Sequence, residues 1–177
     1  AEKTTGNIRH LDTILAHWPR AVIIHVVRDP RDIFASFRRS KKYGGITDFA
    51  NLWCDYLGDV ARFKDALPLD GDNYMELRYE ALVRDPVGEM QAVISFLGED
   101  WEDAVGGFEG KADEHDRVLD LTGHSSTTLE QIAHPISQNR VGLGQGGISD
   151  EEMAIARTVA AERGLGELFA RIEREAR

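Results

Sequence analysis

Two short stretches of the chain have the hydrophobic pattern of β-strands. Residues 21–27 (AVIIHVV) form a continuous run that is rich in β-branched side chains. This pattern is typical of a strand that is buried on both faces of a parallel sheet. Residues 74–79 (YMELRY) predict a second strand, because they follow a run of turn-forming residues, PLDGDN. His25, inside the first run, is expected to be structural.

Longer stretches around these runs have apolar residues at helical spacing, so they predict amphipathic helices. The predicted helices cover residues 7–17, 48–66, 86–97, 150–163 and 165–175. The pattern places Trp18, Val87 and Leu97 on their inner faces. Residues 106–149 are glycine-rich and weakly periodic, which predicts short helices and long loops. Because helices alternate with strands, we expect an α/β fold with a parallel sheet flanked by helices, in one domain over residues 1–177.

The junction after the first strand carries a further helix signal. Asp29 is a good N-cap residue, and Pro30 suits the first helical position. Ile33, Phe34 and Phe37 give this helix an apolar face. In α/β sheets, ligands bind outside the carboxyl ends of strands, and helix N-termini favour anions. The junction is therefore a candidate site for an anionic ligand.

Composition adds limits to this picture. The 177 residues suffice for one domain with a sizeable core, and 42% hydrophobic and 29% charged residues are ordinary values. The sequence has no apolar run near the roughly 18 residues of a membrane span, and no signal-peptide pattern opens it. Cys54 is the sole cysteine, so we expect a buried thiol rather than a disulfide or a multi-cysteine zinc site. A reducing, cytoplasmic location follows as the expectation.

Charge is unevenly distributed. The formal net charge is −10, which argues against general nucleic-acid binding. Residues 28–42 nevertheless contain six Lys or Arg residues and two Asp residues, a local charge of +4, so the remaining residues carry −14. One interpretation is a solvated basic helix face. The other is a site for a compact anionic ligand.

Within this basic segment, Arg28 and Ser36 lie eight residues apart. Arg28 ends the predicted strand, and Ser36 falls about two turns into the following helix. An arginine fork and a hydroxyl together hold a phosphate in a defined orientation. The simpler alternatives are an ordinary helix serine at Ser36 and an ion pair of Arg28 with Asp29 or Asp32.

The segment VVRDPRDIFASF resembles the 3′-phosphate-binding motif of sulfotransferases that use 3′-phosphoadenosine 5′-phosphosulfate (PAPS). The preceding EKTTGN and HWPRAVIIHVVRDPRD, and the later LRYEALVRDPVGEMQAVISFLGEDWEDAV, are similar to further blocks of this family in the same order. The resemblance implies that Arg28 and Ser36 bind the 3′-phosphate and that Tyr79 lies near the adenine. Arg31 either contacts phosphate or pairs with Asp29 or Asp32.

The stretch HPISQNRVGLG is similar to the family's last cofactor-binding loop, which makes Asn139, Arg140 and Gly142 candidates for cofactor contacts. The family's fold is of the nucleotide-kinase type. Its reaction moves a sulfuryl group from PAPS to a hydroxyl or amine and leaves 3′-phosphoadenosine 5′-phosphate (PAP), without a metal. The acceptor is a small molecule, a glycan or a peptide.

One part of the family pattern is missing from these 177 residues. The Gly-rich segment that holds the 5′-phosphosulfate is expected upstream of the matched blocks, and GLGQGG (residues 142–147) reads as a flexible loop instead. Lys3 and Glu2 are the nearest candidates for catalysis: Lys3 for the sulfuryl oxygens or the leaving group, Glu2 as a base or as the partner of Lys3. Two alternatives stay open, a non-catalytic PAP- or PAPS-binding module and a P-loop nucleotide kinase relative.

Overall fold

A computed structural model of the chain describes residues 1–39, 44–67, 69, 71–106, 141–142, 144 and 147–176. The chain divides into two compact units, of which the first comprises Ala1–Glu80 with Gly142–Arg177 and the second Ala81–Val141. The expectation of one domain over residues 1–177 stays a prediction.

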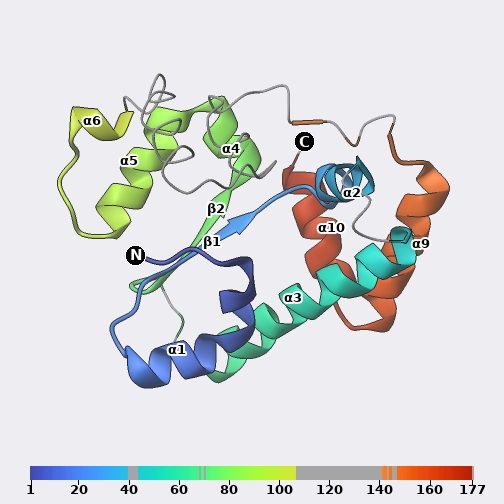
Figure 1. The fold of residues 1–177 in the computed structure, drawn as a ribbon, viewed down its shortest axis with the longest axis horizontal. Helices are drawn as coiled ribbons and strands as arrows, with labels where there is room; N and C mark the ends of the chain where they lie inside the picture. Colours follow the sequence, from blue (N-terminus) through green and yellow to red (C-terminus); the bar gives the residue numbers. More distant parts are fainter. Residues whose placement is uncertain are drawn as a thin grey trace, which may run out of the picture. The chain divides into compact units, whose positions relative to one another are not determined.

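The sheet of the first unit consists, in the described residues, of two parallel strands, β1 (Ile23–Val27) and β2 (Tyr74–Arg78) (Figure 1). The register pairs Ile23 with Tyr74 and Val27 with Arg78. Both strands therefore end side by side at one edge of the sheet. This pairing, with helices around it, confirms the predicted α/β fold with a parallel sheet.

Most predicted helices are present with small shifts at their ends. In the first unit they are η1 (Thr5–His10), a 3-10 helix, and the α-helices α1 (Leu11–His17), α2 (Pro30–Arg39), α3 (Ile46–Ala66), α9 (Asp150–Glu162) and α10 (Gly166–Glu175). Helix α4 (Tyr79–Arg84) directly follows β2, and the second unit contains α5 (Pro86–Phe96) and α6 (Asp103–Gly106).

Helix α3 organises the core of the first unit. Its buried side chains lie at helical spacing, and the helix packs against α2, α9 and η1. Phe49 contacts Phe34 of α2 with ring centroids 5.1 Å apart, and Trp53 meets Phe169 of α10 edge-on at 4.8 Å. Cys54 is fully buried, as predicted, and burial raises the pKa of its thiol.

Two helix starts have the side-chain caps that the backbone requires. Asp85 accepts a hydrogen bond from the backbone N–H of Gly88 at 3.0 Å, which caps α5. At α9, Ser149 and Glu152 form a reciprocal capping box. Such local bonds fix where each helix begins.

Some side chains that the sequence pattern predicted to be buried are exposed. Val26 is 54% exposed, so β1 is not buried on both faces as its apolar run suggested. Trp18 is 64% exposed because the α-helix ends at His17, one residue before it. Val87 and Leu97, at the two ends of α5, are also exposed. The apolar pattern alone therefore does not decide which of these side chains meets a packing partner.

The face of the sheet that carries His25 borders a cavity of about 220 Å³. Its walls include Leu57 and Val60 of α3 and Ile172 of α10. The Nδ1 atom of His25 lies 2.7 Å from the hydroxyl oxygen of Tyr74. Burial lowers the pKa of His25 to about 4; Glu76 opposes this shift, and the cations Lys64 and Arg171 reinforce it.

We expect acid to destabilise the chain through His25. The folded pKa of about 4 lies below the unfolded value of 6.5, so the unfolded chain takes up the proton first as the pH falls. Stability linked to neutral His25 is therefore complete above pH 6.5 and is lost on the way down to pH 4. At pH 5 the loss amounts to about 2 kcal/mol.

Urea unfolding at pH 7 and pH 5 measures this effect. A His25→Gln variant has no titrating group there, so its free energy of unfolding should fall less between the two pH values than that of the wild type. His17→Gln, at an exposed position, serves as the control and should keep the wild-type fall. Equal falls in the wild type and His25→Gln would contradict the assignment.

Helix α10 should contribute strongly to the stability of the first unit through Phe169. This side chain is 1% exposed and packs on Trp53, so Phe169→Ala should cost about 3–5 kcal/mol of unfolding free energy. Ile155→Ala, at a position that is 43% exposed, should cost less than about 1 kcal/mol. Denaturant unfolding measures both, and similar losses would show that α10 is not part of the core.

Candidate functional site

The two residues that follow the strands meet at the carboxyl edge of the sheet. Because Val27 pairs with Arg78, the next positions, Arg28 and Tyr79, lie beside each other. The Arg28 guanidinium carbon sits 4.3 Å from the centroid of the Tyr79 ring, a stacked cation–π contact. The sequence motifs around Arg28 and Tyr79, which are 51 residues apart, are thus brought together by the strand register.

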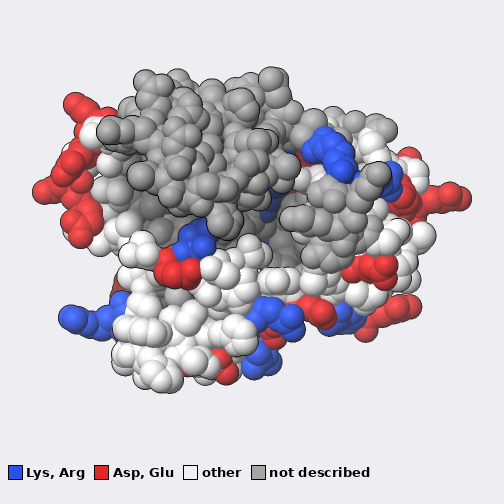
Figure 2. Space-filling view, in the orientation of Figure 1, with Lys and Arg blue, Asp and Glu red and all other residues white. Residues whose placement is uncertain are grey.

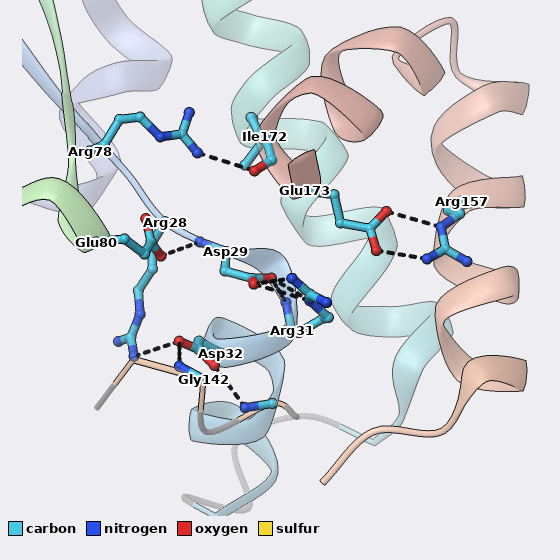
Figure 3. Close-up of polar contacts among 11 residues, drawn as sticks. Arg28, Asp29, Arg31, Asp32, Arg78, Glu80, Gly142, Arg157, Ile172 and Glu173 are labelled. Carbon is cyan, nitrogen blue, oxygen red and sulfur yellow. Dashed lines mark hydrogen bonds and ion pairs between the residues drawn. The ribbon is translucent and has the colours of Figure 1, made fainter. Parts of the chain in front are cut away.

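The next pair of residues along the two strands, Asp29 and Glu80, is also in contact. The backbone N–H of Asp29 donates to the Glu80 carboxylate oxygen Oε1 at 2.8 Å (Figure 3). Glu80 is 1% exposed, and its other oxygen, Oε2, is buried without a hydrogen-bond partner in the described part of the chain. This bond fixes the backbone of the β1–α2 junction immediately after Arg28.

The start of α2 is capped by Asp29, as the sequence predicted. Its carboxylate accepts from the backbone N–H of Arg31 at 2.8 Å and also from the Arg31 guanidinium, with the shortest distance 2.6 Å. Hydrogen bonding to Asp29 raises the pKa of Arg31. Of the alternatives for Arg31, the structure therefore contains the ion pair with Asp29. A phosphate contact of Arg31 stays a prediction.

Asp32 is the third acidic group of the junction, and it is 1% exposed. It accepts from the backbone N–H of Gly142 at 2.9 Å and from that of Gly144 at 2.7 Å. Its Oδ2 atom also lies 3.5 Å from an Arg28 guanidinium nitrogen. In Figure 3 the Arg28 side chain runs toward Asp32 and Gly142, whereas Arg31 turns toward Asp29.

Gly142 thus lies at the same edge as Arg28 and Tyr79. It has a positive φ of 78°, a conformation that favours glycine. Its N–H group is bonded to Asp32, so any contact of Gly142 with a ligand would involve its backbone surface rather than this donor. Arg140 and Asn139 lie outside the described residues, and their predicted cofactor contacts stay predictions.

Ser36 lies on α2, eight residues after Arg28, and is partly buried. In the described part of the chain its hydroxyl has no hydrogen-bond partner. About one turn earlier, Asp32 anchors the same helix to Gly142 and Gly144. The predicted contact of Ser36 with a 3′-phosphate is not tested by this geometry.

The predicted catalytic candidates lie near the first residue. Glu2 is exposed and accepts a hydrogen bond from the Thr4 hydroxyl at 2.5 Å and another from the Asn7 side chain. The bond from Thr4, followed by that from Asn7, lowers the pKa of the Glu2 carboxyl. Lys3 is exposed. Glu2 therefore contacts the start of η1, and the proposed roles of both residues stay predictions.

Sequence reasoning did not identify Glu80 and Gly144, and it considered Asp32 merely as an ion-pair partner. Asp32 stands four residues after Arg28 at the start of a helix, which is a visible signal for that ion pair. Its bonds to the glycines join positions 110 and 112 residues away, and nothing in the local pattern indicates them. The sequence signal for Glu80 is its position: it directly follows Tyr79, as Asp29 directly follows Arg28.

Around this junction, charges are largely matched. Arg38 is bound by Glu152 of α9 and donates to the Gly147 carbonyl oxygen at 2.8 Å. Figure 2 shows acidic and basic side chains interspersed over the described part of the face in view, with no broad basic surface there. Over the described ranges, no cluster of His, Cys, Asp or Glu is placed to hold a metal ion, and no helix has the length and apolarity to cross a bilayer.

The arrangement at the sheet edge is suited to a compact anion. The Arg28 side chain is 20% exposed, with its Nε atom buried, and the Tyr79 ring lies against the guanidinium. Ser36, which is partly buried, lies on α2 four residues after Asp32. Gly142 and Gly144 bring backbone without side chains close to the start of α2. A positive charge, a planar arginine fork and close approach of the backbone are features by which proteins bind phosphate groups.

Comparison with known proteins gives one positive result. The sulfotransferase family matches residues 1–103, which is more than half of the chain and includes both strands, Arg28, Ser36 and Tyr79. No curated protein and no solved structure matches the chain. With the α/β fold and the strand-end site already in place, the match over these residues decides the family: this chain belongs to the sulfotransferase family.

Proposed function

We propose that the chain binds PAPS, and its product PAP, at the carboxyl edge of the β1–β2 sheet and takes part in sulfuryl transfer to a hydroxyl or amine acceptor. One observation carries the proposal. Arg28, Tyr79 and Gly142, which the family resemblance assigns to three separate cofactor-binding blocks, lie at one edge through the Arg28–Tyr79 stack and the bonds to Asp32.

The residues fit a 3′-phosphate in their chemistry. Arg28 supplies a permanently charged fork, and its contact with the Tyr79 ring orients the plane of that fork. Ser36 would add a hydroxyl donor from the next turns of α2. Arg31 is the weaker candidate, because Asp29 already accepts both its side chain and its backbone N–H.

When bound, PAPS would supply the sulfuryl group: its bond to the 5′-phosphate oxygen breaks as a bond forms to the acceptor hydroxyl or amine, whose proton passes to a general base or to solvent, leaving PAP. Lys3 is the candidate for charge stabilisation, since an exposed ammonium group can approach the sulfuryl or phosphate oxygens. Glu2 is less suited to be the base, because two hydrogen bonds stabilise its charged form and lower its pKa.

The acceptor remains a wide class: a small molecule, a glycan or a peptide. Transfer to such acceptors requires no metal in this proposal. A module that binds PAP without transferring sulfate is the alternative, and binding and transfer must therefore be measured separately.

We expect PAP to bind the 177-residue chain and Arg28→Ala to weaken that binding. Loss of a charge-assisted grip on phosphate should reduce the affinity about 30- to 100-fold, because such bonds contribute about 2–3 kcal/mol. Isothermal titration calorimetry and the thermal shift with PAP give the measurement. Tyr79→Ala should weaken binding less, whereas Tyr79→Phe keeps the ring and should bind nearly as the wild type does.

Arg62→Ala is the matched control for this experiment. Arg62 is an exposed arginine with an aromatic contact, to Phe63, and an ion pair, to Asp59, but it lies near the end of α3 rather than at the strand ends. It should leave PAP affinity within about twofold of the wild type. Equal PAP affinity in the wild type and Arg28→Ala would rule out the phosphate assignment.

The transfer reaction has a separate expected outcome. With labelled PAPS and a panel of phenols, sugars and amines, Lys3→Ala should lower the transfer rate at least about tenfold and PAP affinity by a smaller factor, because Lys3 is assigned to charge that develops during transfer. Lys64→Ala, at another exposed lysine, should transfer at the wild-type rate. If the wild type binds PAP but transfers to none of the acceptors, the binding-module alternative is favoured.

A further inference from the structure

One buried carboxylate connects the candidate phosphate site with a distant part of the chain. Asp32, in the first turn of α2, receives the backbone N–H groups of Gly142 and Gly144 at 2.9 and 2.7 Å, one on each carboxylate oxygen. The same residue lies 3.5 Å from the Arg28 guanidinium. We call Gly142 and Gly144 the glycine pair.

The contact between the glycine pair and α2 is too close for a side chain at Gly144. Gly144 is buried, and a Cβ atom added to it would lie 2.5 Å from the Arg31 Cβ and 2.6 Å from the Arg31 carbonyl carbon. The carbonyl carbon and the Arg31 carbonyl oxygen, which would lie 2.7 Å away, are backbone atoms and cannot swing aside as the end of a flexible side chain does. The backbone at Gly144 therefore approaches α2 at a distance that glycine alone allows.

The hydrogen bonds hold this approach in place. A charged acceptor makes shorter and stronger bonds with N–H groups than a neutral one does, and Asp32 is 1% exposed, so water does not compete for it. A buried carboxylate that lost these donors would be left poorly satisfied. The position of the glycine pair is thus fixed relative to Arg28 through a single side chain.

We propose that Asp32 is a positioning residue: by holding the glycine pair and Arg28 in a fixed relation, it sets the affinity of the site for a ligand that carries a 3′-phosphate. This inference rests on the proposed function. It assigns Asp32 no contact with the ligand. Asp32 affects ligand affinity by orienting the glycine pair and Arg28.

The charge of Asp32 has to be kept constant in the test. A carboxylate close to Arg28 also repels a bound phosphate, so removal of its charge would strengthen binding by one route and weaken it by another. Asp32→Glu keeps the charge and moves the acceptor oxygens outward by one methylene group. Gly144→Ala changes no charge and displaces the glycine pair from α2 directly.

Both variants should lower the affinity for PAP at least about tenfold and leave the affinity for adenosine 5′-monophosphate, which lacks the 3′-phosphate, within about twofold. Two controls match them in chemistry. Asp59→Glu alters a carboxylate that binds Arg9 and Arg62, and Gly45→Ala alters a glycine with extended backbone and open space around its Cβ position. Both controls should bind each nucleotide as the wild type does.

A second readout does not require a ligand. In protein labelled with 15N-glycine, the amide proton of Gly142 should exchange with solvent at least about tenfold faster in Asp32→Glu and Gly144→Ala than in the wild type, because its bond to Asp32 is broken. Binding of adenosine 5′-monophosphate and intact far-ultraviolet circular dichroism show that a variant is folded. If Asp32→Glu does not fold, the nucleotide affinities and the Gly142 exchange rate of Gly144→Ala decide whether Asp32 positions the site.

The possible results separate the two proposals. If the wild type does not bind PAP, the proposed function fails, and the exchange rates still decide whether Asp32 holds the glycine pair. If the wild type binds PAP and the variants keep the same ratio of PAP to adenosine 5′-monophosphate affinity, the phosphate proposal stands and the positioning role of Asp32 is overturned. Unchanged exchange at Gly142 overturns it as well.

Discussion

The in-register pairing of two parallel strands is the constraint on which the site depends. Once Val27 lies opposite Arg78, the next two positions of each strand are placed without further choice: Arg28 stacks on Tyr79, and the Asp29 N–H group reaches Glu80. A slip of one residue would turn every side chain of a strand to the opposite face. It would separate the arginine from its ring and the carboxylate from its donor together.

Three buried carboxylates then convert this junction into a rigid structure, and each has a different partner. Glu80 holds the backbone after Arg28, Asp29 caps α2 and neutralises Arg31, and Asp32 binds Gly142 and Gly144. This answers a question that the charge distribution raised. The basic segment is neither simply a solvated face nor simply a ligand site, because Arg31 and Arg38 are bound to acidic groups inside the first unit.

Both strands, the capped start of α2 and the helices other than α4 and α6 followed from local patterns, because spacing, N-cap residues and β-branched runs act over a few residues. Tyr79, predicted as the last residue of the second strand, begins α4 instead. Exposure at Val26 and Trp18 did not follow, since it depends on which elements lie next to them. For the site, Arg28, Ser36 and Tyr79 were predicted through motif resemblance, and the register brought Arg28 and Tyr79 together. The bonds from Asp32 to the glycines were not predictable, because they join residues more than 100 positions apart.

A carboxylate beside the proposed phosphate site has an electrostatic cost, and the contacts of Arg28 and Asp32 give a reason why it would be tolerated. A mobile arginine side chain carries about 2 kcal/mol of rotamer entropy that a ligand would have to overcome. Between the Tyr79 ring and Asp32 the guanidinium is already ordered. Both Asp32 oxygens accept N–H groups, which disperse part of its negative charge. If a phosphate binds there as proposed, preorganisation of the arginine and the glycines would offset the repulsion, because Asp32 contacts both.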